Sequence, residues 1–195
     1  GRTSAAGLAT HFAAVLAEGP SMLYNVPGRT GQDIPDEVVL AVAAHPNFLG
    51  VKECTGNARI AAYAAAGVRC WTGNDDEAHD ARHGAGAAGA VSVASNLCPA
   101  AFARLMAAPD PAAAAALAPL IDWLFCEPNP IAVNTALAMC GLVAPVFRLP
   151  YVPLSKAQRE RGAALIKAAA PFLDGVDPDK VRAMEDDEFK LVSRY

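Results

Sequence analysis

The sequence predicts an α/β fold built around a parallel sheet. Four short segments rich in apolar and β-branched residues recur in the first half of the chain, and helical patterns lie between them. Such alternation, with a period of roughly 20 to 27 residues, is typical of successive βα units. The predicted strands are Met22 to Val26, Phe48 to Lys52, Val68 to Thr72 and Ala90 to Ala94.

Helices are predicted between and after these strands. Pro35 and Asn57 stand where helices begin, and Gly67 stands where one ends. After Asn96 the strand signal stops, so the last hundred residues are interpreted as a helical tail. Its end, from Met184 to Tyr195, alternates weakly and is a candidate extended segment. The predicted helices are Asp36 to Ala44, Ala58 to Ala66, Glu77 to Ala85, Pro99 to Ala107, Pro111 to Phe125, Ile131 to Cys140 and Lys156 to Ala169.

Four βα units fit two architectures, an open doubly wound sheet or half of an eight-stranded barrel. The chain contains neither G-x-G-x-x-G after its first strand nor G-x-x-x-x-G-K-[ST] anywhere, so the nucleotide-binding form of the open sheet lacks its phosphate loop. The barrel is favoured, although a complete one needs about 250 residues.

Composition excludes several classes of function. Hydrophobic residues make up 53% and charged residues 18%, which predicts a globular chain. The net charge of −4 leaves no basic stripe for nucleic acid, and the apolar runs are too short to span a bilayer. The five cysteines lack zinc-ligand spacing, and His79 with His83 is interpreted as a solvated polar pair rather than a metal site. Because Gly1 to Ser4 lead directly into a helical pattern, we expect no signal or transit peptide in this chain.

Polar residues that could carry chemistry follow the strands. Lys52 ends an apolar strand, where burial would disfavour the ammonium form and leave an amine that can attack a ketone. The residues alone leave open whether Lys52 instead pairs with Glu53 or Asp75. Tyr24 is either a proton relay or a packing aromatic.

Arg29 lies in the loop after the first strand. Its guanidinium can grip a carboxylate through two hydrogen bonds, or it can pair with Asp33 or Asp36. The sequence leaves both alternatives open.

Several runs resemble the dihydrodipicolinate synthase family in order and spacing, over essentially the whole chain. The end of the chain resembles the plant and algal branch. The runs are Tyr24-Asn-Val-Pro-Gly-Arg-Thr-Gly31, Gly50-Val-Lys-Glu-Cys-Thr-Gly-Asn57, Thr72-Gly-Asn-Asp-Asp76, Gly89-Ala-Val-Ser-Val-Ala-Ser-Asn96, Glu127-Pro-Asn-Pro-Ile131 and Pro145-Val-Phe-Arg-Leu-Pro-Tyr-Val-Pro153.

The resemblance implies a class I aldolase that condenses pyruvate with aspartate semialdehyde in lysine biosynthesis, without metal or organic cofactor. Lys52 then forms the Schiff base and Tyr24 relays protons. Arg29 holds a substrate carboxylate, Val91 contacts pyruvate through its backbone, and Gly73 lies at the mouth of the pocket.

The resemblance also implies that the chain is the C-terminal portion of the family's protein. Residues 1–97 would be half of a TIM (β/α)8 barrel, and residues 98–195 the last barrel helix and a helical C-terminal region. The partners expected are an N-terminal half-barrel and further copies in a homotetramer, located in a plastid. Alternatives are a sister aldolase, of the N-acetylneuraminate lyase or keto-deoxy-sugar type, and an inactive half-barrel assembly module. Arg29 favours the dihydrodipicolinate synthase pattern over a sugar aldolase.

Overall fold

The computed structural model describes residues 2–193 and divides into two compact units, with the boundary between Val91 and Ser92. The predicted limit between barrel and C-terminal region, after residue 97, stays a prediction. Part of the predicted extended segment, residues 194 and 195, lies outside the described residues.

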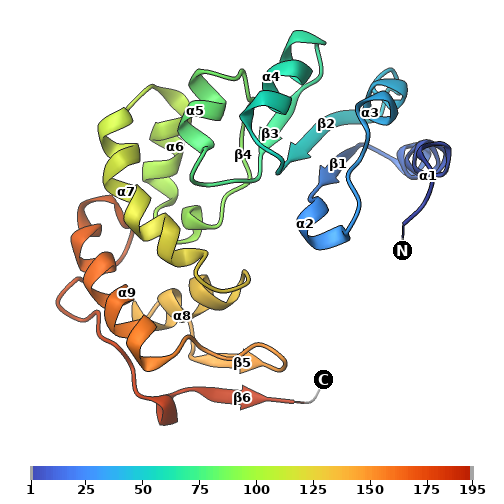
Figure 1. Ribbon diagram of the computed structural model, residues 1–195. Helices are drawn as coiled ribbons and strands as arrows, with labels where there is room; N and C mark the ends of the chain where they lie inside the picture. The colour runs from blue at the N-terminus through green and yellow to red at the C-terminus, as the bar shows by residue number, and fades with distance from the viewer. Residues whose placement is uncertain (1, 194–195) are drawn as a thin grey trace. The chain divides into compact units, whose positions relative to one another are not determined.

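The first unit is the parallel α/β structure that the sequence predicts. Its four strands are parallel and follow one another across the sheet in chain order, β1-β2-β3-β4 (Figure 1). Its elements are α1 (Ala5–Glu18), β1 (Ser21–Asn25), α2 (Pro27–Thr30), α3 (Asp36–Val42), β2 (Phe48–Glu53), α4 (Asn57–Ala65), β3 (Cys70–Thr72), α5 (Ala78–His83) and β4 (Gly89–Ala90).

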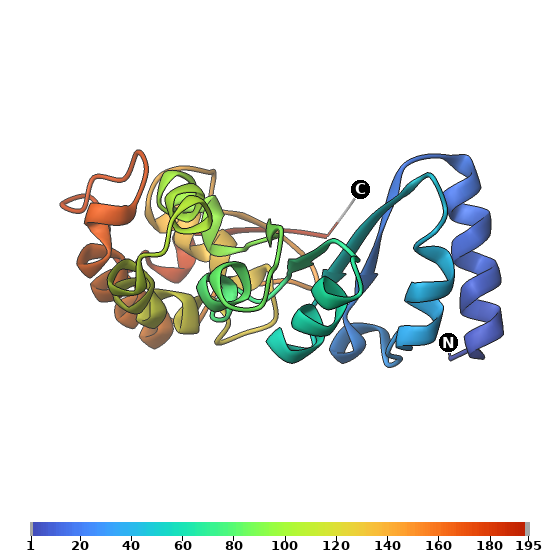
Figure 2. The ribbon, with the colours of Figure 1, turned by 90° about the horizontal axis from the view of Figure 1, so that it is seen from above.

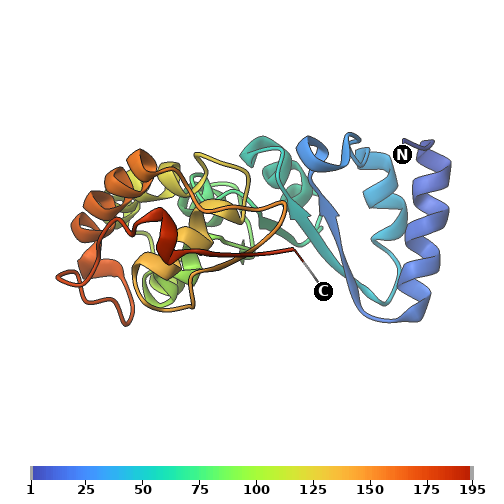
Figure 3. The same cartoon turned by 90° about the horizontal axis from the view of Figure 1, so that it is seen from below.

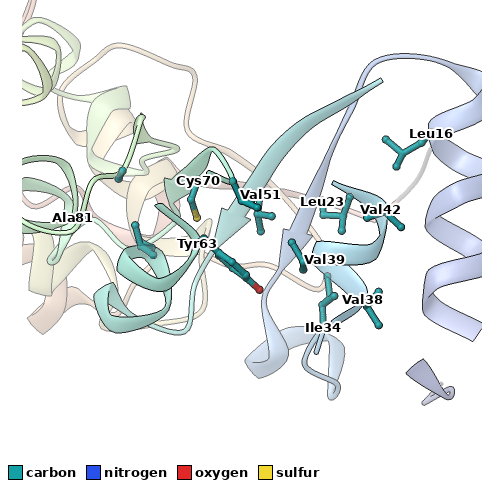
Figure 4. Packing of buried hydrophobic residues seen from close by; sticks show 13 residues of the cluster. Leu16, Leu23, Ile34, Val38, Val39, Val42, Val51, Tyr63, Cys70 and Ala81 are labelled. Atoms are coloured by element: carbon teal, nitrogen blue, oxygen red, sulfur yellow. The ribbon is translucent and has the colours of Figure 1, made fainter. Parts of the chain in front are cut away.

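Side chains alternate between the two faces of this sheet because successive residues of a strand point in opposite directions. On one face Leu23, Val51 and Cys70 are buried beneath the helices (Figure 4). Helices α1 and α3 lie side by side (Figures 2 and 3). Helix α3 contributes three buried valines, Val38, Val39 and Val42, to this core (Figure 4). Each fully buried valine contributes roughly 1.5–3 kcal/mol, which explains why so short a helix is held in place.

The fourth strand is shorter than predicted. The sequence predicts extended chain from Ala90 to Ala94, but β4 ends at Ala90 and a 3₁₀ turn, η1 (Ala94–Asn96), follows. Ser92 explains the difference, because its hydroxyl accepts the Ser95 N–H at 2.9 Å and its carbonyl accepts the Ser95 hydroxyl at 3.1 Å. Such local bonds compete with a sheet ladder, and here they end the strand.

The second unit contains the four predicted helices, and the candidate extended segment at the end of the chain contains strand β6 (Lys190–Val192). The pairing of this strand with an earlier one, β5 (Val146–Arg148), was not predicted. Strands β5 and β6 form a two-stranded parallel sheet (Figure 1), and the Phe147 and Phe189 rings beside it pack edge to face at 5.9 Å. The elements of this unit are α6 (Pro99–Ala107), α7 (Pro111–Leu124), α8 (Ile131–Met139), β5 (Val146–Arg148), α9 (Lys156–Ala168), η2 (Ala170–Phe172), η3 (Asp186–Glu188) and β6 (Lys190–Val192). No helix in residues 2–193 combines the length and apolar character needed to cross a membrane.

Candidate active site

Tyr24 and Lys52 lie side by side on neighbouring strands. They are paired in the register of β1 and β2, and the Lys52 Nζ lies 4.0 Å from the centroid of the Tyr24 ring. The Lys52 side chain is only partly buried, rather than enclosed as the sequence predicts, because this face of the sheet is not the one that the helices of the first unit cover. Tyr24 is 45% exposed on the same face.

Lys52 is not engaged by a carboxylate. It forms no ion pair with any residue in the described range 2–193, so the interpretation that it pairs with Glu53 or Asp75 is not supported. Glu53 points to the opposite face, where it is fully buried and bound by other groups. The amine is therefore available to a ligand on the Tyr24 side of the sheet.

Gly73 lies directly against Lys52 and Cys54. A Cβ atom at position 73 would be 2.3 Å from the Cys54 Sγ and 2.8 Å from the Lys52 Cε, closer than any side chain tolerates. Burial raises the pKa of the Cys54 thiol, and the positive charge of Lys52 lowers it in part. The Tyr24 hydroxyl, through a hydrogen bond, and the Arg29 charge act on the same thiol. Four predicted site residues thus lie around this sulfur, which sequence reasoning missed because a lone cysteine gives no signal.

Arg29 lies in the short helix α2 and is exposed. The interpretation that it pairs with Asp33 or Asp36 is not supported, because both carboxylates bind Arg59 at 2.7 Å. The Arg29 guanidinium is therefore available to bind a ligand.

Val91 follows β4, and its backbone N–H donates to the Thr72 carbonyl at 2.8 Å. Because the N–H is used in the sheet, a backbone contact from Val91 to a ligand would have to involve its carbonyl oxygen.

A buried polar network behind the site was not predicted. Asn25 and Glu53, which directly follow Tyr24 and Lys52, are 1% and 0% exposed. The Asn25 Nδ2 donates to both Glu53 oxygens at 3.0 Å and to the Asp33 Oδ1 at 2.7 Å. Arg59 adds its guanidinium, with Nε 3.7 Å from the Glu53 Oε2.

Because of this network, the stability of the first unit is expected to fall as the pH becomes acidic. Burial alone would raise the pKa of Asp33, but hydrogen bonds from Arg59 and Asn25 lower it below its ordinary value. Because the unfolded chain then binds more protons, the stabilisation from Asp33 is complete above the unfolded pKa of about 3.9 and is lost as the pH falls through the lower folded value. Urea midpoints measured from about pH 5 to about pH 2.5 should fall more steeply for the unchanged chain than for Asp33→Asn. Equal slopes would contradict this, and Asp187→Asn, at an exposed position, serves as control.

The described residues offer no obvious metal centre. Among residues 2–193, no group of three or more histidine, cysteine, aspartate or glutamate side chains is arranged to hold a metal ion. The centroids of the His79 and His83 rings lie 5.0 Å apart with the ring planes tilted by 54°, and the His79 Nδ1 lies 3.0 Å from the Asp80 Oδ1.

Known proteins resemble this chain over its whole length. The sequence is 51% identical over 198 residues to "4-hydroxy-tetrahydrodipicolinate synthase, chloroplastic" of Nicotiana tabacum, which covers 100% of this chain and 54% of that protein. The protein of the same name from Glycine max is 51% identical over 196 residues, with 100% and 59% covered. The chain therefore spans only a little more than half the length of these relatives.

A solved structure shows the same fold. Dihydrodipicolinate synthase from Acinetobacter baumannii, crystallised with pyruvate, superimposes with a TM-score of 0.80 at 34% identity and covers 87% of this chain and 62% of that one. The fold is accordingly of the TIM-barrel α/β type, followed by a mainly helical C-terminal part. The model of the family described as "Dihydrodipicolinate synthetase family" matches residues 1–169. The chain belongs to the dihydrodipicolinate synthetase family.

Proposed function

We propose that this chain supplies the Schiff-base portion of a 4-hydroxy-tetrahydrodipicolinate synthase, which condenses pyruvate with L-aspartate 4-semialdehyde in lysine biosynthesis. The observation that carries the proposal is the Lys52 amine, in no ion pair within residues 2–193 and 4.0 Å from the Tyr24 ring at adjoining strand ends. Membership of the family and the pyruvate in the A. baumannii structure support it.

In the proposed mechanism, uncharged Lys52 attacks the pyruvate ketone, and loss of water gives an imine. The protonated imine nitrogen withdraws electrons, so a methyl proton leaves and an enamine forms. The enamine carbon attacks the aldehyde of the semialdehyde, and the amino group of that substrate then displaces Lys52 as the ring closes. Tyr24 gives and takes the protons at the reacting centre. No metal or organic cofactor takes part in this scheme.

Arg29, Gly73 and Val91 are proposed to bind the substrates. The Arg29 guanidinium is planar and suited to a carboxylate. Gly73 leaves the space in which the Lys52 stem lies. Val91 would offer its backbone carbonyl to pyruvate.

We propose that the four-stranded sheet is half of the barrel and that an N-terminal segment supplies the other strands. The sheet face that carries Tyr24 also exposes Met22, at 40%, and Val91 beyond β4 is 44% exposed. Apolar side chains on an uncovered sheet face are typical of a surface that packs against another segment. By similarity to the chloroplastic plant relatives, we further propose that the enzyme is located in a plastid. The homotetramer implied by the resemblance to the family is proposed as well.

Reductive trapping tests this function. The chain is incubated with ¹³C-pyruvate and borohydride, alone and with the N-terminal segment of the tobacco relative, and the adduct is located by peptide mass. Labelling at Lys52, followed by turnover with the semialdehyde, is expected. Turnover with sugar acids but not the semialdehyde would assign a sister aldolase. Absence of any Lys52 adduct, even with the N-terminal segment present, would leave a non-catalytic assembly module.

Gly73→Ala is expected to slow this trapping by about 100-fold, because the new methyl group would be wedged between the Cys54 Sγ, at 2.3 Å, and the Lys52 Cε, at 2.8 Å, and would push the Lys52 stem out of place. The loss should be steric, so removing the sulfur in Gly73→Ala/Cys54→Ala should restore part of the rate. Trapping rates of the two single variants and the double variant measure this. A double variant as slow as Gly73→Ala would show that crowding against Cys54 is not the cause.

A further inference from the structure

Glu53, at 0% exposed, is the most deeply buried carboxylate among residues 2–193, and the proposed chemistry does not use it. It lies on the face of β2 opposite Lys52, yet it contacts the backbone next to Lys52. Its Oε1 accepts the N–H groups of Cys54 and Thr55 at 2.9 and 2.8 Å. The carboxylate therefore fixes the turn into which the Lys52 strand runs.

The same carboxylate also holds the end of the Tyr24 strand. Both of its oxygens accept hydrogen bonds from the Asn25 Nδ2 at 3.0 Å. Neighbouring residues of a strand point to opposite faces, so fixing Asn25 and Glu53 on the buried face sets the direction of Tyr24 and Lys52 on the other.

A third connection runs to the segment that follows Arg29. The Asn25 Oδ1 accepts the Ile34 N–H at 3.1 Å, and the Arg59 Nη1 donates to both Asp33 oxygens at 2.7 Å. Asn25 and Arg59 both contact Glu53. The buried Glu53 carboxylate is thus linked to the three segments that carry Lys52, Tyr24 and Arg29.

Glu53 is not needed to balance the Arg59 charge. Asp33 and Asp36 each lie 2.7 Å from the Arg59 guanidinium, whereas the Glu53 Oε2 is 3.7 Å away. The closest partners of Glu53 are instead the backbone and amide N–H groups at the two strand ends. A role in geometry explains these contacts better than a role in charge balance.

We propose that Glu53 is a positioning residue that holds Lys52 and Tyr24 in register for imine formation. The effect of Glu53 on the rate of imine formation rests on the proposed function. Its effect on the geometry of Lys52 and Tyr24 does not.

The kinetic experiment compares Glu53→Gln with Asp36→Asn, using the chain together with the N-terminal segment of the tobacco relative. Glutamine keeps the size of the side chain and one acceptor oxygen. Its amide NH₂ takes the place of the Oε2 that accepts from Asn25, so donor faces donor and the hold on the β1 end should be weakened. Asp36→Asn removes another carboxylate that binds Arg59 and touches neither strand end. We expect the Glu53 variant to form the pyruvate adduct about 10-fold to 100-fold more slowly, at full final amplitude, and the Asp36 variant to match the unchanged chain. A reduced amplitude at unchanged rate would show partial unfolding and overturn the proposal.

A second readout needs no reaction. Reductive ¹³C-methylation labels the lysines, and the dimethyl signal of Lys52 should be shifted upfield by the Tyr24 ring 4.0 Å away, unlike that of Lys180, whose side chain is 82% exposed. In Glu53→Gln this shift should collapse toward the Lys180 value, and in Asp36→Asn it should persist. A shift retained in Glu53→Gln, or lost equally in both variants, would overturn the proposal. If the unchanged chain forms no pyruvate adduct, the proposed function fails, while the NMR comparison still decides whether Glu53 positions Lys52.

Discussion

Replacing Lys52 by methionine is expected to abolish pyruvate trapping. Methionine keeps most of the length of the side chain but has no amine, and an imine cannot form without one. Because Lys52 forms no ion pair within residues 2–193, the substitution removes its contact with the Tyr24 ring and its charge beside Cys54. The free energy of unfolding should therefore change by no more than about 1 kcal/mol. Peptide mass after borohydride treatment and urea unfolding together measure both effects.

Lys180→Met is the matched control, because it removes an exposed lysine of the other unit. Its adduct yield should equal that of the unchanged chain. An adduct that persists in Lys52→Met, on another lysine, would refute the assignment of the nucleophile. Loss of the adduct together with a large loss of stability would mean that Lys52 supports the fold.

The local pattern of the sequence predicts the first unit well. Strands β1 and β2, and the places of Tyr24 and Lys52 near their ends, follow from apolar runs of six residues or fewer, each with a polar residue near its end. In a parallel sheet such ends gather at one edge. The spacing of apolar residues and the position of a residue within a strand can both be read from a single sequence. One sequence is therefore enough to place Tyr24 and Lys52 near the ends of their strands.

Contacts between distant residues could not be predicted in this way. Glu53 follows Lys52 directly and was considered as its partner, but strand alternation turns it to the other face. Arg59 is a charged residue of a helix, and only the folded chain shows that it binds Asp33, twenty-six residues earlier. The pairing of β5 with β6 joins three-residue strands at 146 and 190, too short for a recognisable period.

A single methyl group at position 162 is expected to destabilise the second unit strongly. Gly162 lies on α9 against the indole of Trp123 on α7, and a Cβ there would be 2.0 Å from the Trp123 Cζ2 and 2.5 Å from Cε2. Trp123 is 1% exposed and its Nε1 donates to the Gln158 carbonyl at 2.9 Å, so the ring has nowhere to move without losing that bond. Overpacking costs about 1–3 kcal/mol and the lost hydrogen bond about 1 kcal/mol, while alanine recovers about 1 kcal/mol of helix propensity. A net loss of about 1–3 kcal/mol should appear in urea unfolding followed by circular dichroism.

The cause of this loss can be isolated by a double-mutant cycle. The Trp123 atoms that would clash with a Cβ at position 162 belong to the six-membered ring of the indole. The smaller phenylalanine ring does not reach the same place, so Trp123→Phe should relieve the crowding. Trp123→Phe alone is destabilising, because it leaves a cavity and an unpaired Gln158 carbonyl. In the Gly162→Ala background it should cost less, with a coupling of about 1–3 kcal/mol. Gly28→Ala adds the same methyl group where no atom lies within 4 Å, and should be nearly neutral. Additive losses would show that glycine at 162 serves the helix backbone and not the approach of α9 to α7.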